Sequence, residues 1–361
     1  PGKRQAMVNA NLPTTKTLRP VREDSVDFDN TENLYIEGDN LEVLKILQES
    51  YLGKIKMIYI DPPYNTGKDF VYKDNFTQDS DEYKEESGQT DEYNRRLVSN
   101  PDTSGRYHSD WLSMMYPRLK LARNLLTEDG VIFMSIDDNE VDNLRKIGDE
   151  IFGEMNFISS IACITKPSGR SDDKYLATAH EYVLVFRKSP SFEMGLFDVD
   201  EKIAKRYSKT DSSKDPVRLY REEDLRKRGS HDERNDRPNL FYPFFFNENS
   251  GKLLVGANSD NTPEGFRRIE PMKNESTEGT WRWGMETAIA NLHYLHPRYM
   301  KNKEQWSVFQ WEYLDERSGV KPTTNWNFKD VNSERGTESF KNIGFDSKVF
   351  QNPKPLGIIK R

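Results

Sequence analysis

One short segment constrains the fold of this chain more than any other. The apolar run KMIYI at residues 56–60 is followed directly by Asp61, Pro62, Pro63 and Tyr64. A β-rich apolar run that ends in an acid, two prolines and an aromatic residue is typical of a buried strand whose carboxyl end carries a stiff polar segment. Open α/β sheets bind ligands at the carboxyl ends of their strands. The segment therefore predicts an α/β sheet with a binding site immediately after this strand.

The same four residues suit methyl transfer to an exocyclic amino nitrogen. The Asp61 carboxylate and the Pro62 carbonyl are both acceptors, so together they can hold the two N–H bonds of an amino group and direct its lone pair at an electrophilic methyl group. Tyr64 offers a flat face on which an extruded base can stack, a contact worth roughly 1–3 kcal/mol. The alternative is an ordinary Pro-Pro turn, with Asp61 as a turn acid and Tyr64 packed on the surface.

Several stretches together carry a family resemblance. They are LYIEGDNLEVL at 34–44, DPPYNTG at 61–67, NPKPL at 352–356, and residues 111–126, 130–138 and 181–188. On these residues the chain resembles the β-class adenine-N6 DNA methyltransferases, and most closely the modification subunit of type III restriction-modification systems. The resemblance implies a Rossmann-like, permuted, doubly wound α/β sheet. It also implies transfer of a methyl group from S-adenosylmethionine to N6 of a flipped-out adenine.

The resemblance assigns roles to individual residues. The catalytic residues that it implies are Asp61, Pro62, Pro63 and Tyr64; Tyr64 and Asn65 contact the target base; Asp39, Asp61, Lys354 and Pro355 bind the cofactor. Asp39 has an equally good interpretation as a helix cap, and Lys354 as the residue before a helix that starts with proline. No metal site is expected, because the five histidines are scattered and Cys163 is the only cysteine.

The chain is expected to have four parts. Residues 1–32 form a polar N-terminal arm, and residues 33–189 form the catalytic domain, with a lid-like loop at 66–109. Residues 190–345, rich in aromatic clusters and mixed charge, form an irregular α+β target-recognition module. Residues 346–361 begin a returning cofactor-binding segment.

Hydrophobic periodicity predicts the elements of the catalytic domain. Strands are expected at 34–37, 54–60, 131–136, 158–164 and 182–186, and helices from 39, over 111–126 and over 141–151. The last two strands are expected to form an antiparallel pair at the sheet edge. Asp39 and Glu42 have the spacing of a capping box at the start of the first helix.

The glycine-rich cofactor loop of the family, Phe-x-Gly-x-Gly, is not found in the sequence. The family places this loop after the segment that resembles 352–361. The chain is therefore expected to be an N-terminal fragment, truncated before the glycine-loop strand, that continues past Arg361 in the natural protein. Alone, it is expected to be inactive and to bind S-adenosylmethionine weakly or not at all. A sheet without those strands would expose an unpaired edge and favour association.

Charge and composition limit the partners. A net charge of -7 argues against indiscriminate coating of nucleic acid but permits a local basic face. Residues 202–237 carry 12 Lys or Arg against 8 Asp or Glu, which suits either a solvated mixed-charge surface or phosphate contacts. No apolar stretch is long enough for a bilayer span. The single cysteine fits a reducing compartment.

The resemblance implies double-stranded DNA as substrate, a homodimer, a helicase-nuclease restriction subunit as partner, and the bacterial cytoplasm. Two other functions stay open. One is methylation of cytosine N4, although that motif more often begins with Ser than with an acid such as Asp61. The other is a non-catalytic DNA-binding subunit with a methyltransferase-like fold.

Overall fold

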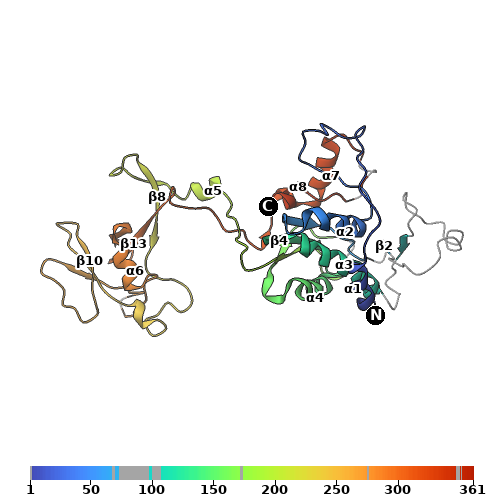
Figure 1. Ribbon diagram of the computed structural model, residues 1–361. Coiled ribbons are helices and arrows are strands. Elements are labelled where there is room, and N and C mark those ends of the chain that lie inside the picture. The colour runs from blue at the N-terminus through green and yellow to red at the C-terminus, as the bar shows by residue number, and fades with distance from the viewer. Residues whose placement is uncertain are drawn as a thin grey trace, which may run out of the picture. The chain divides into compact units, whose positions relative to one another are not determined.

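The computed structural model describes residues 2–66, 70–72, 97–99, 107–170, 174–274, 276–346, 350 and 352–361. The chain forms two compact units (Figure 1): the first comprises Pro1–Met194 and Thr323–Arg361, and the second comprises Gly195–Pro322. The sequence predicts instead a module at 190–345, but residues 323–345 belong to the first unit. The expected lid at 66–109 lies almost entirely outside the described residues. Its described parts include the antiparallel strands β2 (Phe70–Tyr72) and β3 (Leu97–Ser99).

A five-stranded sheet forms the centre of the first unit. Its order is β1 (Ile55–Ile60), β4 (Leu126–Ile136), β6 (Glu181–Arg187), β5 (Phe157–Cys163) and β14 (Asn325–Trp326). β1 is parallel to β4, whereas β6 runs antiparallel to both of its neighbours. The carboxyl end of β1 and the amino end of β6 therefore lie at the same edge of the sheet. This topology brings residues that follow β1 close to residues that begin β6.

Both faces of this sheet are covered. On one face, alternate residues of β4 such as Ile132 and Met134 pack with buried side chains of α3 (Tyr107–Leu125) and α4 (Val141–Phe152). The helices α1 (Lys3–Asn11) and α2 (Asn40–Tyr51) pack against α3. On the other face, Val131 packs with Val331 and Ile358 from the C-terminal segment. The first unit is thus a three-layer α/β structure.

The C-terminal segment contains the short helix η4 (Lys329–Val331), α7 (Ser333–Asn342) and α8 (Leu356–Ile359). Figure 1 shows α7 and α8, in red, in the same unit as the N-terminal helices in blue and green. A Cβ atom added at Gly336 of α7 would lie 1.9 Å from the Pro353 carbonyl oxygen. Glycine at this position therefore lets the chain before α8 pass directly against α7, which fixes the position of Lys354.

Most predicted elements of the first unit are confirmed, and the structure differs from the prediction in a few places. The strand expected at 34–37 is wrong: these residues form no strand, and Leu34 and Tyr35 are 69% and 90% exposed. The antiparallel pair β5–β6 is confirmed, but it lies inside the sheet because β14 continues it beyond β5. Asp39 caps α2 as predicted, and the Glu42 carboxylate accepts hydrogen bonds from Thr14 and Lys45. The expected arm at 1–32 begins with α1, whose Ala6 is part of the core.

The second unit has the irregular α+β character expected of it. One antiparallel sheet has the order β12 (Leu295–Met300), β13 (Gln305–Tyr313), β8 (Arg218–Asp224) and β7 (Lys209–Asp211). A smaller sheet contains β10 (Leu253–Val255), β9 (Phe244–Phe246) and β11 (Arg267–Ile269). The helices α5 (Glu201–Ala204) and α6 (Met285–Ala290) complete its longer elements. Tyr242, Phe244 and Trp281 are buried in its core, so these aromatics are structural.

Candidate active site

The segment after β1 is held in place by a buried tryptophan. Trp111 of α3 is fully buried, and its Nε1 donates a 2.7 Å hydrogen bond to the carbonyl oxygen of Pro63. Pro62 is buried as well, and no donor among the described residues reaches its carbonyl oxygen. The Asp61 side chain is 37% exposed. Asp61 thus has an exposed acceptor, and Pro62 has a carbonyl oxygen with no hydrogen bond from the described residues, on a segment that Trp111 anchors.

Four residues from three distant parts of the chain meet beside this segment. The Lys354 Nζ atom lies 2.7 Å from Glu181 Oε2 and 3.5 Å from Asp61 Oδ1. The Tyr64 hydroxyl donates to the same Glu181 oxygen at 3.0 Å and accepts a short hydrogen bond from Lys354. The Lys354 ammonium also lies 4.5 Å from the centre of the Tyr64 ring. The structure therefore brings together Asp61, Tyr64 and Lys354, which the sequence predicts as site residues, and adds Glu181.

Burial dominates the electrostatics of this cluster. Burial raises the pKa of Asp61 above its ordinary value; the Lys354 ammonium opposes this shift and the Glu181 carboxylate reinforces it. Burial and the Glu181 carboxylate raise the pKa of the Tyr64 hydroxyl, which therefore stays protonated and donates. Burial likewise raises the pKa of Tyr59, whose hydroxyl lies 2.6 Å from Ser135 Oγ.

Asn65 has contacts that differ from the expected role in substrate binding. It is fully buried, its backbone has φ of 59°, and its Nδ2 donates a 2.5 Å hydrogen bond to Glu140 Oε1. Glu140 is itself buried and also contacts His108, at 2.7 Å, and Asn143, at 2.7 Å. Asn65 and Glu140 therefore fasten the end of the DPPY segment to the start of α4, and burial leaves Asn65 no surface for a base.

The two remaining predicted cofactor residues occupy helix starts. The Asp39 carboxylate accepts hydrogen bonds from the backbone N–H groups of Leu41 and Glu42, at 2.8 and 3.1 Å, which is the capping role. Pro355 is the N-cap residue of α8 and directly follows Lys354. Pro355 therefore places Lys354 directly before the start of α8.

Sequence reasoning missed Glu181, Glu140 and Trp111 as residues of this site. A signal existed for Glu181 alone: an acid at the amino end of a strand that is antiparallel to the central strands must lie at the edge where β1 ends. For Glu140 and Trp111 the signal is tertiary, because their partners are 75 and 48 residues away in the chain.

The basic stretch at 202–237 is largely neutralised within the second unit. Seven of its twelve Lys and Arg residues form ion pairs: Lys205, Lys209, Arg218, Arg221, Arg226, Arg228 and Arg234. For these residues the mixed-charge interpretation is the better one. Phosphate contacts by this stretch would depend on the other five.

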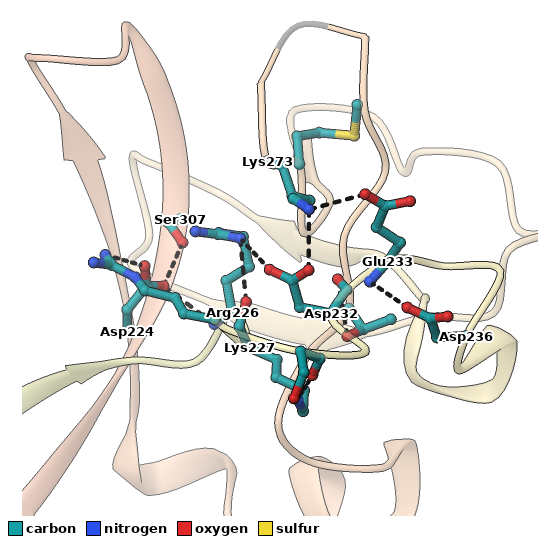
Figure 2. Close-up of polar contacts among 12 residues, drawn as sticks. Asp224, Arg226, Lys227, Asp232, Glu233, Asp236, Lys273 and Ser307 are labelled. Atoms are coloured by element: carbon teal, nitrogen blue, oxygen red, sulfur yellow. Dashed lines mark hydrogen bonds and ion pairs between the residues drawn. The ribbon is translucent and has the colours of Figure 1, made fainter.

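Figure 2 shows how one such cluster joins a loop to its neighbours. Lys273 Nζ donates to Asp232 Oδ1 and Glu233 Oε1, both at 3.0 Å. Arg226 Nη1 donates to the Lys227 carbonyl at 3.1 Å and lies 3.9 Å from Asp232 Oδ2. Ser307 of β13 donates to Asp224 at 3.2 Å. These contacts tie the loop after β8 to the segment around Lys273.

The described residues contain neither a metal-binding cluster nor a membrane-spanning helix. No group of three or more His, Cys, Asp or Glu residues there is arranged to hold a metal ion. None of the helices described is both long and apolar enough to cross a membrane.

Comparison with known proteins identifies the class. The family model described as DNA methylase, of the N6/N4 group, matches residues 55–361, and the chain belongs to this family. The EcoPI Mod subunit, a type III restriction-modification enzyme of Escherichia phage P1, is 36% identical over 99% of this chain. The type II methyltransferase M.KpnI of Klebsiella pneumoniae is 33% identical over 97% of this chain.

The chain covers different shares of these two relatives. The chain spans 55% of the phage P1 protein and 73% of M.KpnI. Among solved structures, the M1.HpyAVI-SAM complex is 14% identical, with a TM-score of 0.25 over 46% of this chain and 58% of that chain. This likeness is too low to support a comparison of the two folds.

Proposed function

We propose that this chain carries the catalytic and target-recognition parts of a site-specific adenine-N6 DNA methyltransferase that uses S-adenosylmethionine. The observation that carries the proposal is the pair of acceptors at Asp61 and Pro62, on a segment that hydrogen bonds of Trp111 and Asn65 anchor to the rest of the first unit. An amino group placed between them would donate one hydrogen bond to each, and its lone pair would point away from both. Neither acceptor has to act as a strong base.

The residues around Asp61 fit the proposed cofactor. The Glu181 carboxylate raises the pKa of both Asp61 and Asp137, and the Lys354 ammonium lies beside Glu181 and Asp61. Their net negative charge suits the methionyl end of S-adenosylmethionine, which carries a sulfonium and an ammonium against one carboxylate. When bound, the cofactor supplies the electrophilic methyl group. Asp39, Lys354 and Pro355 remain proposed members of the cofactor site.

Tyr64 is proposed to stack on the flipped-out base. One face of its ring lies against the Lys354 ammonium, and its hydroxyl is fixed by Glu181. A ring held in this way loses little freedom when a base stacks on it. Stacking would offset part of the few kcal/mol that unstacking a base from duplex DNA costs.

The finer assignments are part of the same proposal. The sheet is the permuted methyltransferase sheet, the second unit reads the DNA target, and the protein is the modification subunit of a type III system. Double-stranded DNA, a second copy of the protein and a helicase-nuclease restriction subunit are its proposed partners, in the bacterial cytoplasm. The similarity to three Mod subunits of type III restriction-modification enzymes supports this assignment, whereas M.KpnI is a type II methyltransferase.

Nucleoside analysis tests the proposal. DNA treated with the full-length protein and labelled S-adenosylmethionine is expected to contain labelled N6-methyladenine. Asp61→Ala is expected to abolish the label while leaving DNA affinity largely intact. Label in N4-methylcytosine would establish the alternative acceptor, and DNA binding without label in any base would establish a non-catalytic subunit.

A further inference from the structure

Lys354 is placed between two carboxylates and binds one of them more closely. Its ammonium is 2.7 Å from Glu181 and 3.5 Å from Asp61. Two carboxylates competing for one ammonium cannot both form a close ion pair with it in this geometry. Because Coulomb attraction and hydrogen bonding both favour the shorter contact, Glu181 holds the lysine more strongly, and Asp61 keeps only the longer ion pair with it.

Glu181 is well placed to hold the lysine. Its side chain is 15% exposed, and its Oε2 atom accepts hydrogen bonds from both Lys354 and Tyr64. The pairing of β6 with β4 and β5 fixes its backbone. The close passage of residue 353 against Gly336 fixes the backbone beside Lys354. The ion pair therefore joins two rigid parts of the first unit.

We propose that Glu181 is a positioning residue for methyl transfer: by binding Lys354 and the Tyr64 hydroxyl, it keeps the ammonium from forming a close ion pair with Asp61, so that the Asp61 carboxylate can accept the target amino group. This inference rests on the function proposed above. Without the Glu181 charge, the ammonium would move toward Asp61, which is its remaining carboxylate neighbour. A close Lys354–Asp61 pair would occupy the acceptor that the reaction needs.

The groups around Asp61 allow the electrostatic part to be tested. Tyr59 at the end of β1 and Cys163 at the end of β5 stay neutral, because burial raises the pKa of the Tyr59 hydroxyl and raises that of the Cys163 thiol to about 12. Among the described residues, the charged groups that act on the pKa of Asp61 are the ammonium of Lys354 and the carboxylate of Glu181. Since Glu181 raises the pKa of Asp61, removing its charge lowers that pKa.

The test uses three variants of the full-length protein: Glu181→Gln, Glu181→Asp and the double variant Glu181→Gln with Lys354→Met. Single-turnover methylation is measured at saturating DNA and cofactor, with thermal unfolding as the check on folding. We expect Glu181→Gln to slow transfer on the order of 10- to 100-fold, as for other misplaced catalytic groups. Glu181→Asp is expected to retain more activity. Because the cofactor is saturating, the loss of Lys354 as a proposed cofactor contact does not limit the rate. The double variant is therefore expected to be faster than Glu181→Gln alone, since it removes the lysine that would pair with Asp61.

The pH profile supplies the second readout. In Glu181→Gln the acidic limb of the rate is expected to move to lower pH. A folded Glu181→Gln with the wild-type rate, or a double variant slower than the single one, would overturn the inference. If Asp61→Ala abolishes transfer while Glu181→Gln does not affect it, only this inference fails. If Asp61→Ala is itself active, the proposed function fails.

Discussion

The indole nitrogen of Trp111 donates a hydrogen bond of 2.7 Å to the carbonyl of Pro63, so that a residue of α3 holds the segment that follows β1. Trp111→Phe keeps an aromatic ring in this fully buried position but removes the donor. An unsatisfied, partly buried carbonyl costs about 1–3 kcal/mol of unfolding free energy. We expect this loss in chemical denaturation, together with slower methyl transfer at saturating substrates, because the acceptors at Asp61 and Pro62 lose their support.

Trp281→Phe is the matched control. Trp281 is also fully buried, and its Nε1 donates a 2.7 Å hydrogen bond to the Tyr242 carbonyl in the second unit. The Trp281→Phe variant should lose a similar amount of unfolding free energy. Its transfer rate at saturating DNA should stay near that of the wild-type protein. Equal losses of rate in both variants would show that Trp111 acts through general stability alone.

Asp61 is predicted to lower the stability of the protein at neutral pH. Because its pKa is raised on folding, the folded state binds its proton more tightly than the unfolded state does. The stability that this group contributes is present below the ordinary pKa of an aspartate, which is near 4. It is lost as the pH rises from there through the raised pKa of the folded state. Asp61→Asn should increase the melting temperature at pH 7 and have little effect below pH 4, while abolishing transfer. An equal or lower melting temperature at pH 7 would contradict the prediction.

Gly336 is predicted to be essential for the position of Lys354. A Cβ atom at this residue would lie 1.9 Å from the Pro353 carbonyl oxygen, so the backbone before Lys354 would have to move. Overpacking of this kind costs typically 1–3 kcal/mol. Gly336→Ala should therefore lower both stability and transfer rate. The control is Gly195→Ala, because a Cβ atom at Gly195 meets nothing within 4 Å; it should change neither.

The sequence predicts the catalytic edge well, because its signals are local. Two signals are read from residues that are close in the sequence: the β-rich run before Asp61 and the helical period over 111–126. The structure has β1 and α3 at these positions. The strand expected at 34–37 has the same kind of local signal, but strands also require a partner, and here none pairs with it. Local preference was insufficient without that pairing.

Contacts between distant residues explain what else the sequence did not reveal. Lys354 and Glu181 are 173 residues apart, and only the order of the sheet and the passage against Gly336 bring them together. Asn65 could be assigned to the substrate from its place beside Tyr64, but its direction depends on the backbone φ of 59° and on Glu140. The predicted boundary near 345 differs from the observed one because β14 and α7 return to the first unit through tertiary contacts, such as the pairing of β14 with β5.

Asp232 is predicted to stabilise the second unit in a manner that depends on pH. The hydrogen bond from Lys273 lowers the pKa of its carboxyl, and the charges of Lys273 and Arg226 add to this effect. The stabilisation is therefore present at pH values above the ordinary pKa of an aspartate, near 4. It is lost as the pH falls through the lowered pKa of the folded state. Asp232→Asn should therefore increase hydrogen exchange of the loop at 226–236 at pH 7, and this difference should shrink below pH 4.

Glu278→Gln is the control for this prediction. It breaks the exposed ion pair with Arg234 and should change the hydrogen exchange of the loop little, because exposed ion pairs contribute little to stability. A loop that exchanges equally in both variants at pH 7 would show that the contacts of Asp232 in Figure 2 do not hold it.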